Sequence, residues 1–293
     1  MGLRKRVQTL FLFLTNGYWL FPFTRSIYRG PMKLVCSPGL NCFSCPAATT
    51  YCPLGALQQL FAGIRLSLET GQLHVGLYVV GSLGAMGGFF GRMICGWACP
   101  FGLFQELLHK IPSPKFGIWP GLRYFKYILL VSMVVVLPLV IVDESGSGKT
   151  WFCAYVCPAG TLEAGLPLIF MRPELRANLG WIFGLKVMIL AGFTGWAILS
   201  SRPFCRTACP LGAFYALFKG VSWLRVELDS HRCTGCGACH SVCPMGVKIN
   251  ETPNSRECIS CLACRRACPH HAVALGFGSG DTGTARCPQQ VKS

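Results

Sequence analysis

Long apolar stretches alternate with polar segments along the first 200 residues of the chain. Four of them approach or reach the roughly 17–25 residues that cross a bilayer as one helix. They lie at 7–23, 73–91, 122–142 and 181–200. The pattern predicts four transmembrane helices. We expect the first to be retained rather than cleaved as a signal peptide, because no small-residue cleavage site follows it.

The polar segments between these stretches contain a repeated string, Cys-Pro-x-Gly. It begins at Cys52, Cys99, Cys157 and Cys209. Proline is favoured in the first turn of a helix, so each string is expected to place a thiol at a helix start. There the helix dipole and the free N–H groups favour a thiolate. Amphipathic stretches follow, which predicts four short interfacial helices at 54–68, 101–108, 162–170 and 211–218.

A second cysteine precedes each string. In the last three strings it lies four residues earlier, at Cys95, Cys153 and Cys205. In the first string the spacing is longer, and Cys45 is nearest, with Cys42 and Cys36 further upstream. The chain up to residue 225 therefore divides into two similar halves, about 1–115 and 116–225, with two predicted transmembrane helices each.

The pattern changes beyond residue 226, where Cys-x2-Cys-x2-Cys-x3-Cys-Pro occurs twice. This spacing is typical of bacterial domains that hold two [4Fe–4S] clusters, in which the fourth cysteine of each run ligates the other cluster. The predicted ligand sets are Cys233, Cys236, Cys239 and Cys268, and Cys258, Cys261, Cys264 and Cys243. Zinc sites or disulfides fit this doubled spacing poorly, because a zinc site needs four ligands, usually in two separated pairs. We expect a ferredoxin-like α+β domain at 226–275 and a flexible tail at 276–293.

Composition supports a membrane protein. Hydrophobic residues make up 52% of the chain and charged residues 13%, and the mean hydropathy is +0.46. The net charge is +16, but the basic residues are scattered near the ends of the predicted spans rather than clustered. Lipid headgroups and an acidic redox partner are therefore better counterparts than nucleic acid.

The distribution of basic residues also predicts an orientation. Segments 1–6 and 92–126 carry eight Lys and Arg residues in 41 positions, whereas segments 23–72 and 143–180 carry seven in 88. Because basic residues are enriched in cytoplasmic loops, we expect both termini in the cytoplasm. The setting would be the cytoplasmic membrane of a bacterium or archaeon, where reducing conditions protect the thiols of the double cysteine run.

This topology sorts the remaining cysteines by membrane face. Cys95, Cys99, Cys205 and Cys209 are expected at the inner face, and Cys45, Cys52, Cys153 and Cys157 at the outer face. Each group supplies four thiolates, which is one [4Fe–4S] cluster, so the chain is expected to hold two ferredoxin-type clusters and up to four in all. Disulfides, copper sites or redox-active dithiols are the alternatives for these pairs. Cys36 and Cys42 are alternative outer ligands or a disulfide.

Two strings carry a family resemblance: Gly91-Arg-Met-Ile-Cys-Gly-Trp-Ala-Cys-Pro-Phe-Gly and Cys205-Arg-Thr-Ala-Cys-Pro-Leu-Gly. With the double cysteine run that follows, they resemble the membrane polyferredoxin family. That family includes the quinol dehydrogenase subunit of periplasmic nitrate reductase, the C-terminal half of the nitrous-oxide reductase regulator and the cytochrome oxidase assembly ferredoxin. The resemblance covers nearly the whole chain.

The resemblance implies that the inner-face cysteines and those of the double run are cluster ligands. It also implies electron transfer between the quinone pool, or a cytoplasmic donor, and an extracytoplasmic reductase. The six outer cysteines exceed the family pattern, and the chain has no flavin-attachment segment like that of the nitrous-oxide regulator. A flavin would therefore belong to a partner.

The sequence thus predicts an α-helical membrane protein that conducts electrons as a subunit of an oxidoreductase complex. Its redox partners, such as a flavin or haem protein, would lie on one or both sides of the membrane. The first alternative is a quinol dehydrogenase subunit whose membrane half binds a quinone and whose outer cysteines are structural. The second is an assembly factor whose paired thiolates reduce or transfer copper.

Overall fold

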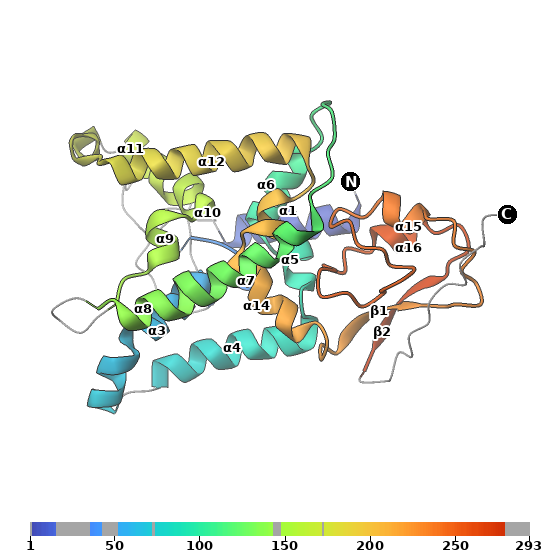
Figure 1. The fold of residues 1–293 in the computed structure, drawn as a ribbon, viewed down its shortest axis with the longest axis horizontal. Coiled ribbons are helices and arrows are strands. Elements are labelled where there is room, and N and C mark those ends of the chain that lie inside the picture. The colour runs from blue at the N-terminus through green and yellow to red at the C-terminus, as the bar shows by residue number, and fades with distance from the viewer. Residues whose placement is uncertain are drawn as a thin grey trace.

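Long helices run lengthwise, side by side, through most of the molecule (Figure 1). The structure is a computed structural model that describes residues 2–15, 36–42, 52–71, 74–142, 148–171 and 173–278. Its long helical elements are α1 (Leu3–Thr15), α3 (Pro53–Thr70), α4 (His74–Phe90), the continuous run Pro120–Val140 and α12 (Trp181–Leu199).

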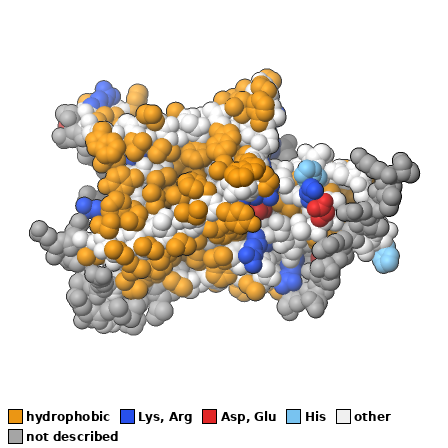
Figure 2. Space-filling model, viewed as in Figure 1, with side chains coloured by type: hydrophobic (Ala, Val, Ile, Leu, Met, Phe, Trp, Pro, Cys, Tyr) orange, Lys and Arg blue, Asp and Glu red, His pale blue; other side chains and the backbone are white. Residues whose placement is uncertain are grey.

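Two of these helices, Pro120–Val140 and Trp181–Leu199, are long and apolar enough to cross a membrane. They match the predicted spans at 122–142 and 181–200. The predicted span at 73–91 corresponds to α4, which contains a shorter apolar stretch, Tyr78–Phe90. The predicted span at 7–23 lies partly outside the described residues. Hydrophobic side chains cover much of the helical body, as Figure 2 shows, and charged side chains are concentrated toward its ends.

The helical run Pro120–Val140 changes its winding along its length. It comprises η2 (Pro120–Tyr124), α7 (Phe125–Leu129), the π-helical η3 (Leu130–Val136) and α8 (Leu137–Val140). Pro138 has no N–H to donate to the preceding turn, and a π-turn is a common local adjustment to such a gap. A second π-helical turn, η4 (Thr161–Gly165), likewise precedes a proline, Pro167, in α11 (Leu166–Met171).

A helix begins at the proline of each Cys-Pro-x-Gly string. These helices are α3, α6 (Pro100–Leu108), α10 (Pro158–Gly160) and α14 (Pro210–Phe218). Before the last three lie α5 (Met93–Trp97), α9 (Trp151–Tyr155) and α13 (Pro203–Thr207), and η5 (Pro173–Asn178) leads into α12. In α14 the side chains of Leu211, Ala213, Tyr215 and Ala216 are buried. This helix therefore packs inside the bundle instead of lying on its surface, because apolar residues occur on most of its circumference.

The double cysteine run forms a small unit at one end of the bundle (Figure 1). Its strands β1 (Leu224–Leu228) and β2 (Val273–Phe277) pair antiparallel, with Leu224 opposite Phe277 and Leu228 opposite Val273. Between them lie α15 (Ala238–Ser241), α16 (Ala263–Ala267) and long loops. The strands close the unit and hold the two cysteine runs side by side.

Candidate iron–sulfur sites

The double run brings its eight cysteines together as two sets. Cys233, Cys236, Cys239 and Cys268 line one cavity; we call them the distal set. Cys243, Cys258, Cys261 and Cys264 line another; we call them the proximal set. In each set the fourth cysteine comes from the other run, as the spacing predicts for two [4Fe–4S] clusters.

The two runs have the same backbone path. Gly235 in the first run and Ser260 in the second occupy equivalent positions, and both have positive φ. The same is true of Gly237 and Leu262, two residues later. Gly246 and His271 form a third matching pair, three residues after the last cysteine of each run. These six residues lie in loops. Their positive φ values curl the chain so that the cysteines of each set face one centre. Val247 and Ala272, which follow this third pair, donate their N–H groups to the sulfurs of Cys243 and Cys268, at 3.4 Å in both runs.

The proximal set faces the helical bundle. Trp97 donates its indole N–H to the carbonyl of Ser260 (3.0 Å), and the Lys219 ammonium donates to the Ser260 hydroxyl (3.0 Å). Gly96 lies so close to the carbonyl of Ile259 that a Cβ there would be 2.6 Å from it. A side chain at this position would push the ferredoxin-like unit away. The distal set lies farther out, and Cys236 is its exposed member.

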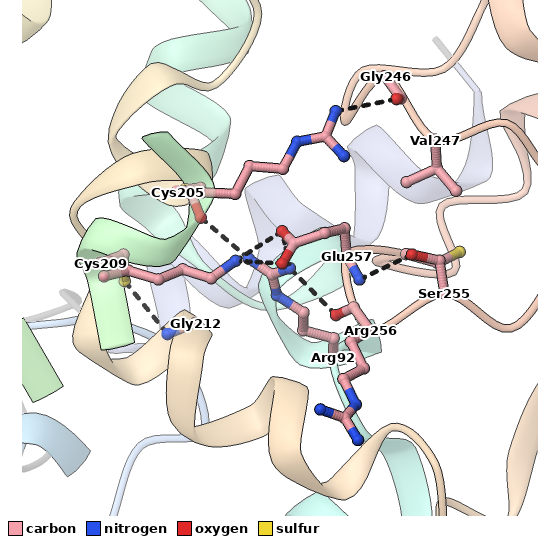
Figure 3. Close-up of polar contacts among 12 residues, drawn as sticks. Arg92, Cys205, Cys209, Gly212, Gly246, Val247, Ser255, Arg256 and Glu257 are labelled. Carbon is pink, nitrogen blue, oxygen red and sulfur yellow. Dashed lines mark hydrogen bonds and ion pairs between the residues drawn. The ribbon is translucent and has the colours of Figure 1, made fainter. Parts of the chain in front are cut away.

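A buried ion-pair network fixes this contact (Figure 3). The Glu257 carboxylate accepts from the Arg92 guanidinium (2.7 Å) and from the Lys126 ammonium (2.5 and 2.6 Å). Arg92 also donates to the carbonyl of Arg256 (3.2 Å). Burial by itself would raise the pKa of Glu257, but the charges of Arg92 and Lys126 outweigh it and hold that pKa below its usual value. The carboxylate is therefore ionised where it joins the two parts of the molecule.

Four buried cysteines form the set nearest to the ferredoxin-like unit, which we call the inner set. They are Cys95, Cys99, Cys205 and Cys209. Burial raises the pKa of Cys99 to about 12, and the neighbouring thiols of Cys205 and Cys95 contribute to that shift. Thiols that raise one another's pKa in this way lie close together. Both halves of the chain thus contribute two cysteines to one place.

Two arginines join the halves at the inner set. Arg92 donates to the carbonyl of Cys205 (2.9 Å), and Arg202 donates to the carbonyl of Cys95 (2.7 Å). Each arginine lies three residues before the first inner-set cysteine of its own half, so the contact is reciprocal. Arg202 is paired with Glu106 (2.9 Å), which also binds Arg4 (2.6 Å). Both arginine side chains are fully buried, so they place positive charge beside these thiols.

The outer set lies toward the other end of the bundle, around α9 and α10 (Figure 1). Cys42, Cys52, Cys153 and Cys157 line one cavity of about 300 Å³. Cys42, which the sequence gives as an alternative ligand, is thus one of the four cysteines described in this cavity; Cys45, which the spacing favours, lies outside the described residues. Cys36 is buried elsewhere, where its thiol donates to the carbonyl of Ser37 (3.7 Å). Cys287 also lies outside the described residues.

The fourth residue of each Cys-Pro-x-Gly string explains the motif. Gly160 and Gly212 donate their N–H groups to the sulfurs of Cys157 and Cys209, at 3.4 Å in both cases. Burial raises the pKa of Cys52 well above its usual value, while the N–H of Gly55 acts against that shift. The Gly102 N–H acts in the same way on Cys99. Each cysteine thus occupies the N-cap position of its helix, and at Cys157 and Cys209 the helix start directs an N–H donor at the sulfur.

A glutamine spans the two halves at each set. Gln58 donates to the sulfur of Cys153 (3.0 Å) and accepts the N–H of Phe152 (3.0 Å). Gln105 does the same at the inner set, donating to Cys205 (3.2 Å) and accepting from Phe204 (3.1 Å). Both glutamines lie six residues after the Cys-Pro cysteine of their own string. Each therefore fixes a cysteine loop of the other half.

The outer set has a different electrostatic environment. The Glu163 carboxylate accepts the N–H of Cys42 (2.8 Å), and burial raises the pKa of Glu163 to about 8. Lys186 donates to the carbonyl of Cys153 (3.2 Å). At the positions that correspond to Arg202 and Arg92, three residues before the first cysteine, the outer set has Thr150 and Gly39.

The inner and outer sets are neighbours. The N–H of Leu40 acts on the sulfur of Cys99, and the N–H of the next residue, Asn41, acts on Cys52. Successive residues lie 3.8 Å apart, so the two sulfurs are within about 12 Å of each other. Tyr215, which is fully buried, lies in electrostatic range of Cys95 in one set and Cys52 in the other, and donates to the carbonyl of Pro38 (3.0 Å).

These sets fit iron–sulfur clusters on their own chemistry. Four buried thiols repel one another when ionised, and cations between them relieve that repulsion, which is why a coordinating thiol is deprotonated outright. Across the described ranges, no group of three or more His, Cys, Asp or Glu side chains is arranged to hold a single metal ion. In a cubane cluster each thiolate binds a different iron, so its ligands are spread more widely than those of one tetrahedral ion.

Sequence reasoning did not identify the glutamines or the arginines. Both leave a signal: Gln58 and Gln105 end the same Cys-Pro-x-Gly-x-x-Gln string, and Arg92 and Arg202 both precede a cysteine by three residues. Their contacts cross between halves, so only the packing reveals what each side chain touches.

Comparison with known proteins agrees with this chemistry. A family described as "4Fe-4S binding domain" matches residues 51–69, 74–118, 126–169 and 182–227, and one described as "4Fe-4S dicluster domain" matches residues 225–269. The fold and the cysteine sets define an iron–sulfur electron-transfer protein of the ferredoxin type. The chain belongs to the polyferredoxin family of 4Fe-4S-binding proteins.

Individual relatives cover part of the chain. The chain is 29% identical over 177 residues to the uncharacterized protein MJ0749 of Methanocaldococcus jannaschii, covering 57% of each, and 30% identical over 200 residues to MJ0750 of the same organism, covering 64% of this chain and 72% of that protein. It is 30% identical over 197 residues to the methylamine utilization ferredoxin-type protein MauN of Paracoccus denitrificans, covering 66% of this chain and 60% of MauN. The chain thus spans little more than half the length of MJ0749 and MauN. No solved structure matches.

Proposed function

We propose that the protein is a membrane-bound iron–sulfur subunit that passes electrons between a cytoplasmic redox partner and an extracytoplasmic one. The clusters supply reversible one-electron chemistry. The chain contributes the ligand sets, their order and their electrostatic surroundings. Relatives named for ferredoxin-type function fit an electron-transfer role.

The observation that carries the proposal is the continuous order of the four cysteine sets. Cys236 is exposed at the distal end, and the proximal set follows it. Gly96 and Trp97 join the proximal set to the inner set, and Leu40 and Asn41 join the inner set to the outer set. A hydrocarbon core is roughly 30 Å thick. Two sets placed within about 12 Å of each other inside the bundle shorten that gap.

The same order fits a path whose two ends lie on opposite faces of a membrane. The apolar runs Pro120–Val140 and Trp181–Leu199 lie between the inner-set loops and the outer-set loops. With the ferredoxin-like unit in the cytoplasm, the outer set lies toward the opposite face, where an extracytoplasmic partner has access. We propose that each of the four sets holds one [4Fe–4S] cluster.

Iron counting tests this assignment. Anaerobically purified wild type is expected to contain about 16 irons per chain, four for each cluster. Cys153→Ser removes an outer-set ligand and is expected to lose about four of them. Cys36→Ser is the matched control, because Cys36 is a buried cysteine outside every set, and it is expected to lose none. Equal iron in Cys153→Ser and wild type would show that the outer cysteines do not hold a cluster.

A further inference from the structure

Residues 36–42, which lie between α1 and α3 in the chain, run through the interior of the bundle rather than over its surface. The side chains of Ser37, Leu40 and Asn41 are at most 2% exposed, and Gly39 is buried as well. Irregular segments normally lie at the surface, where water satisfies their backbone groups. A buried one needs partners for that backbone inside the protein, and those partners indicate its role.

This segment lies between the inner and outer sets and contacts ligands of both. The N–H of Leu40 acts on the sulfur of Cys99 in the inner set. The N–H of the next residue, Asn41, acts on the sulfur of Cys52 in the outer set. Cys42 then ends the segment and lines the outer cavity itself. A single peptide unit therefore links the two N–H groups that reach the two sets.

Gly39 allows the segment to lie directly against the inner set. A Cβ at this position would be 2.8 Å from the carbonyl oxygen of Ala98 and 2.8 Å from the Cα of Cys99. Both are backbone atoms, so they cannot turn aside as the end of a flexible side chain can. The φ of Gly39 is not positive, so its backbone conformation would admit other residues. Glycine is required here by the close approach of two backbone segments.

Tyr215 holds the same segment from the other half of the chain. It is fully buried, and its hydroxyl donates to the carbonyl of Pro38 (3.0 Å). Tyr215 occupies the sixth position after the cysteine of its Cys-Pro-x-Gly string. At this position the other strings have Gln58, Gln105 and Glu163, each of which bonds to a cysteine-bearing segment of the other half. Tyr215 follows the same rule, and the segment that it reaches is the one between the two sets.

We propose that Gly39 and Tyr215 are positioning residues for electron transfer between the inner and outer clusters, because they hold Leu40 and Asn41 against the ligands of both. The inference rests on the proposed function, since it needs a cluster at each set. In the transfer one cluster loses an electron and is oxidised, and the other gains it and is reduced. No bond forms or breaks, and no further reactant takes part. Electronic overlap falls steeply with distance, so a small displacement of the segment weakens the link.

EPR spectroscopy of the fully reduced full chain tests the inference, because the spin coupling of two clusters depends on the same contact that the electron crosses. Gly39→Ala moves a backbone contact from 2.8 Å to at least 3.4 Å, the ordinary contact distance. The splitting between the inner and outer clusters is expected to shrink in Gly39→Ala and to shrink further in Gly39→Val. Tyr215→Phe keeps the ring and removes the hydroxyl, so a smaller loss of splitting is expected. Iron content should equal that of wild type in Gly39→Ala and Tyr215→Phe.

The matched control is Gly148→Ala. A Cβ there would also meet backbone, the carbonyl of Pro138, but Gly148 lies outside every cysteine set. It is expected to keep the wild-type splitting, and a loss equal to that of Gly39→Ala would overturn the inference in favour of general strain. Full iron content with wild-type splitting in both Gly39→Ala and Tyr215→Phe would also overturn it. If Gly39→Ala loses iron, the splitting in Tyr215→Phe decides alone.

Cys153→Ser separates this inference from the proposed function. A wild-type splitting that disappears in Cys153→Ser but stays unchanged in Gly39→Ala and Tyr215→Phe contradicts the positioning role alone. Wild type without any splitting, and with the same iron content as Cys153→Ser, contradicts the outer cluster itself.

Discussion

The inner and outer sets are built from the same parts and differ mainly in charge. Both are formed between the halves, both have Cys-Pro helix caps, and each has a glutamine that donates to a sulfur. The inner set adds Arg92 and Arg202, which are fully buried and donate to cysteine carbonyls. The outer set has Thr150 and Gly39 at those positions, and its charged groups are a buried Glu163 and Lys186, which donates to the carbonyl of Cys153. One scaffold thus creates two sites with different expected reduction potentials, because nearby positive charge favours the more negative, reduced cluster.

The largest difference should appear when an acidic residue is removed from each set. Glu257→Leu leaves Arg92 and Lys126 buried without their carboxylate, which is expected to cost about 3–5 kcal/mol. Glu163→Leu removes a group that is neutral below about pH 8 and one hydrogen bond to Cys42, which is expected to cost about 1–2 kcal/mol. Thermal unfolding followed by cluster absorbance at pH 7 measures both, and equal losses would refute the contrast.

A smaller effect should separate the reduction potentials. Arg202→Met removes a buried charge beside the inner set and is expected to lower the potential of that cluster. One charge about 7 Å away at an effective dielectric constant of about 20 contributes roughly 2 kcal/mol, or roughly 100 mV for one electron. Thr150→Met changes the corresponding outer position without changing charge. In redox titrations monitored by EPR it should leave the outer potential in place, and a shift as large as that of Arg202→Met would contradict the role of charge.

The smallest effect concerns the feature that the two sets share. Gln58→Leu and Gln105→Leu each remove one hydrogen bond to a cysteine sulfur, and such bonds raise cluster potentials. Each variant is expected to lower the potential of its own set by roughly 60 mV, the equivalent of about 1.4 kcal/mol. The other set should not change. If either variant shifted both sets equally, the glutamines would act through the fold as a whole rather than through one sulfur.

The comparison also explains what the sequence reveals and what it does not. The members of the distal and proximal sets can be predicted from the spacing of the cysteines. This is possible because a tight loop fixes the last cysteine of each run relative to its neighbours. The internal repeat likewise predicts that each half contributes one Cys-Pro string to the inner set and one to the outer set. The position of Cys42 in the outer cavity could not be predicted in this way, since Cys42 lies ten residues before Cys52, whereas the other strings have a spacing of four. Its place depends on Glu163, 121 residues away in the chain.

The buried ion-pair network could not be predicted from the sequence either. Arg92, Lys126 and Glu257 lie far apart in the sequence and meet only where the ferredoxin-like unit contacts the bundle. Hydropathy predicts where the helices lie in the sequence, but it does not predict which side chains form hydrogen bonds between the two halves. Likewise, the position of α14 after a Cys-Pro string led to the prediction of an interfacial helix, yet its neighbours cover most of it, as its apolar circumference allows.

We propose that the inner and outer sets each hold a cluster and lie next to each other. EPR spectroscopy of the fully reduced protein tests it most directly, because two reduced clusters whose nearest ligands are within about 12 Å interact magnetically. Wild type is predicted to show a broadened or split signal that becomes simpler in Cys153→Ser, while Cys36→Ser keeps the wild-type spectrum. A wild-type spectrum equal to the sum of isolated clusters, and unchanged in Cys153→Ser, would show that the inner and outer sets do not hold two neighbouring clusters.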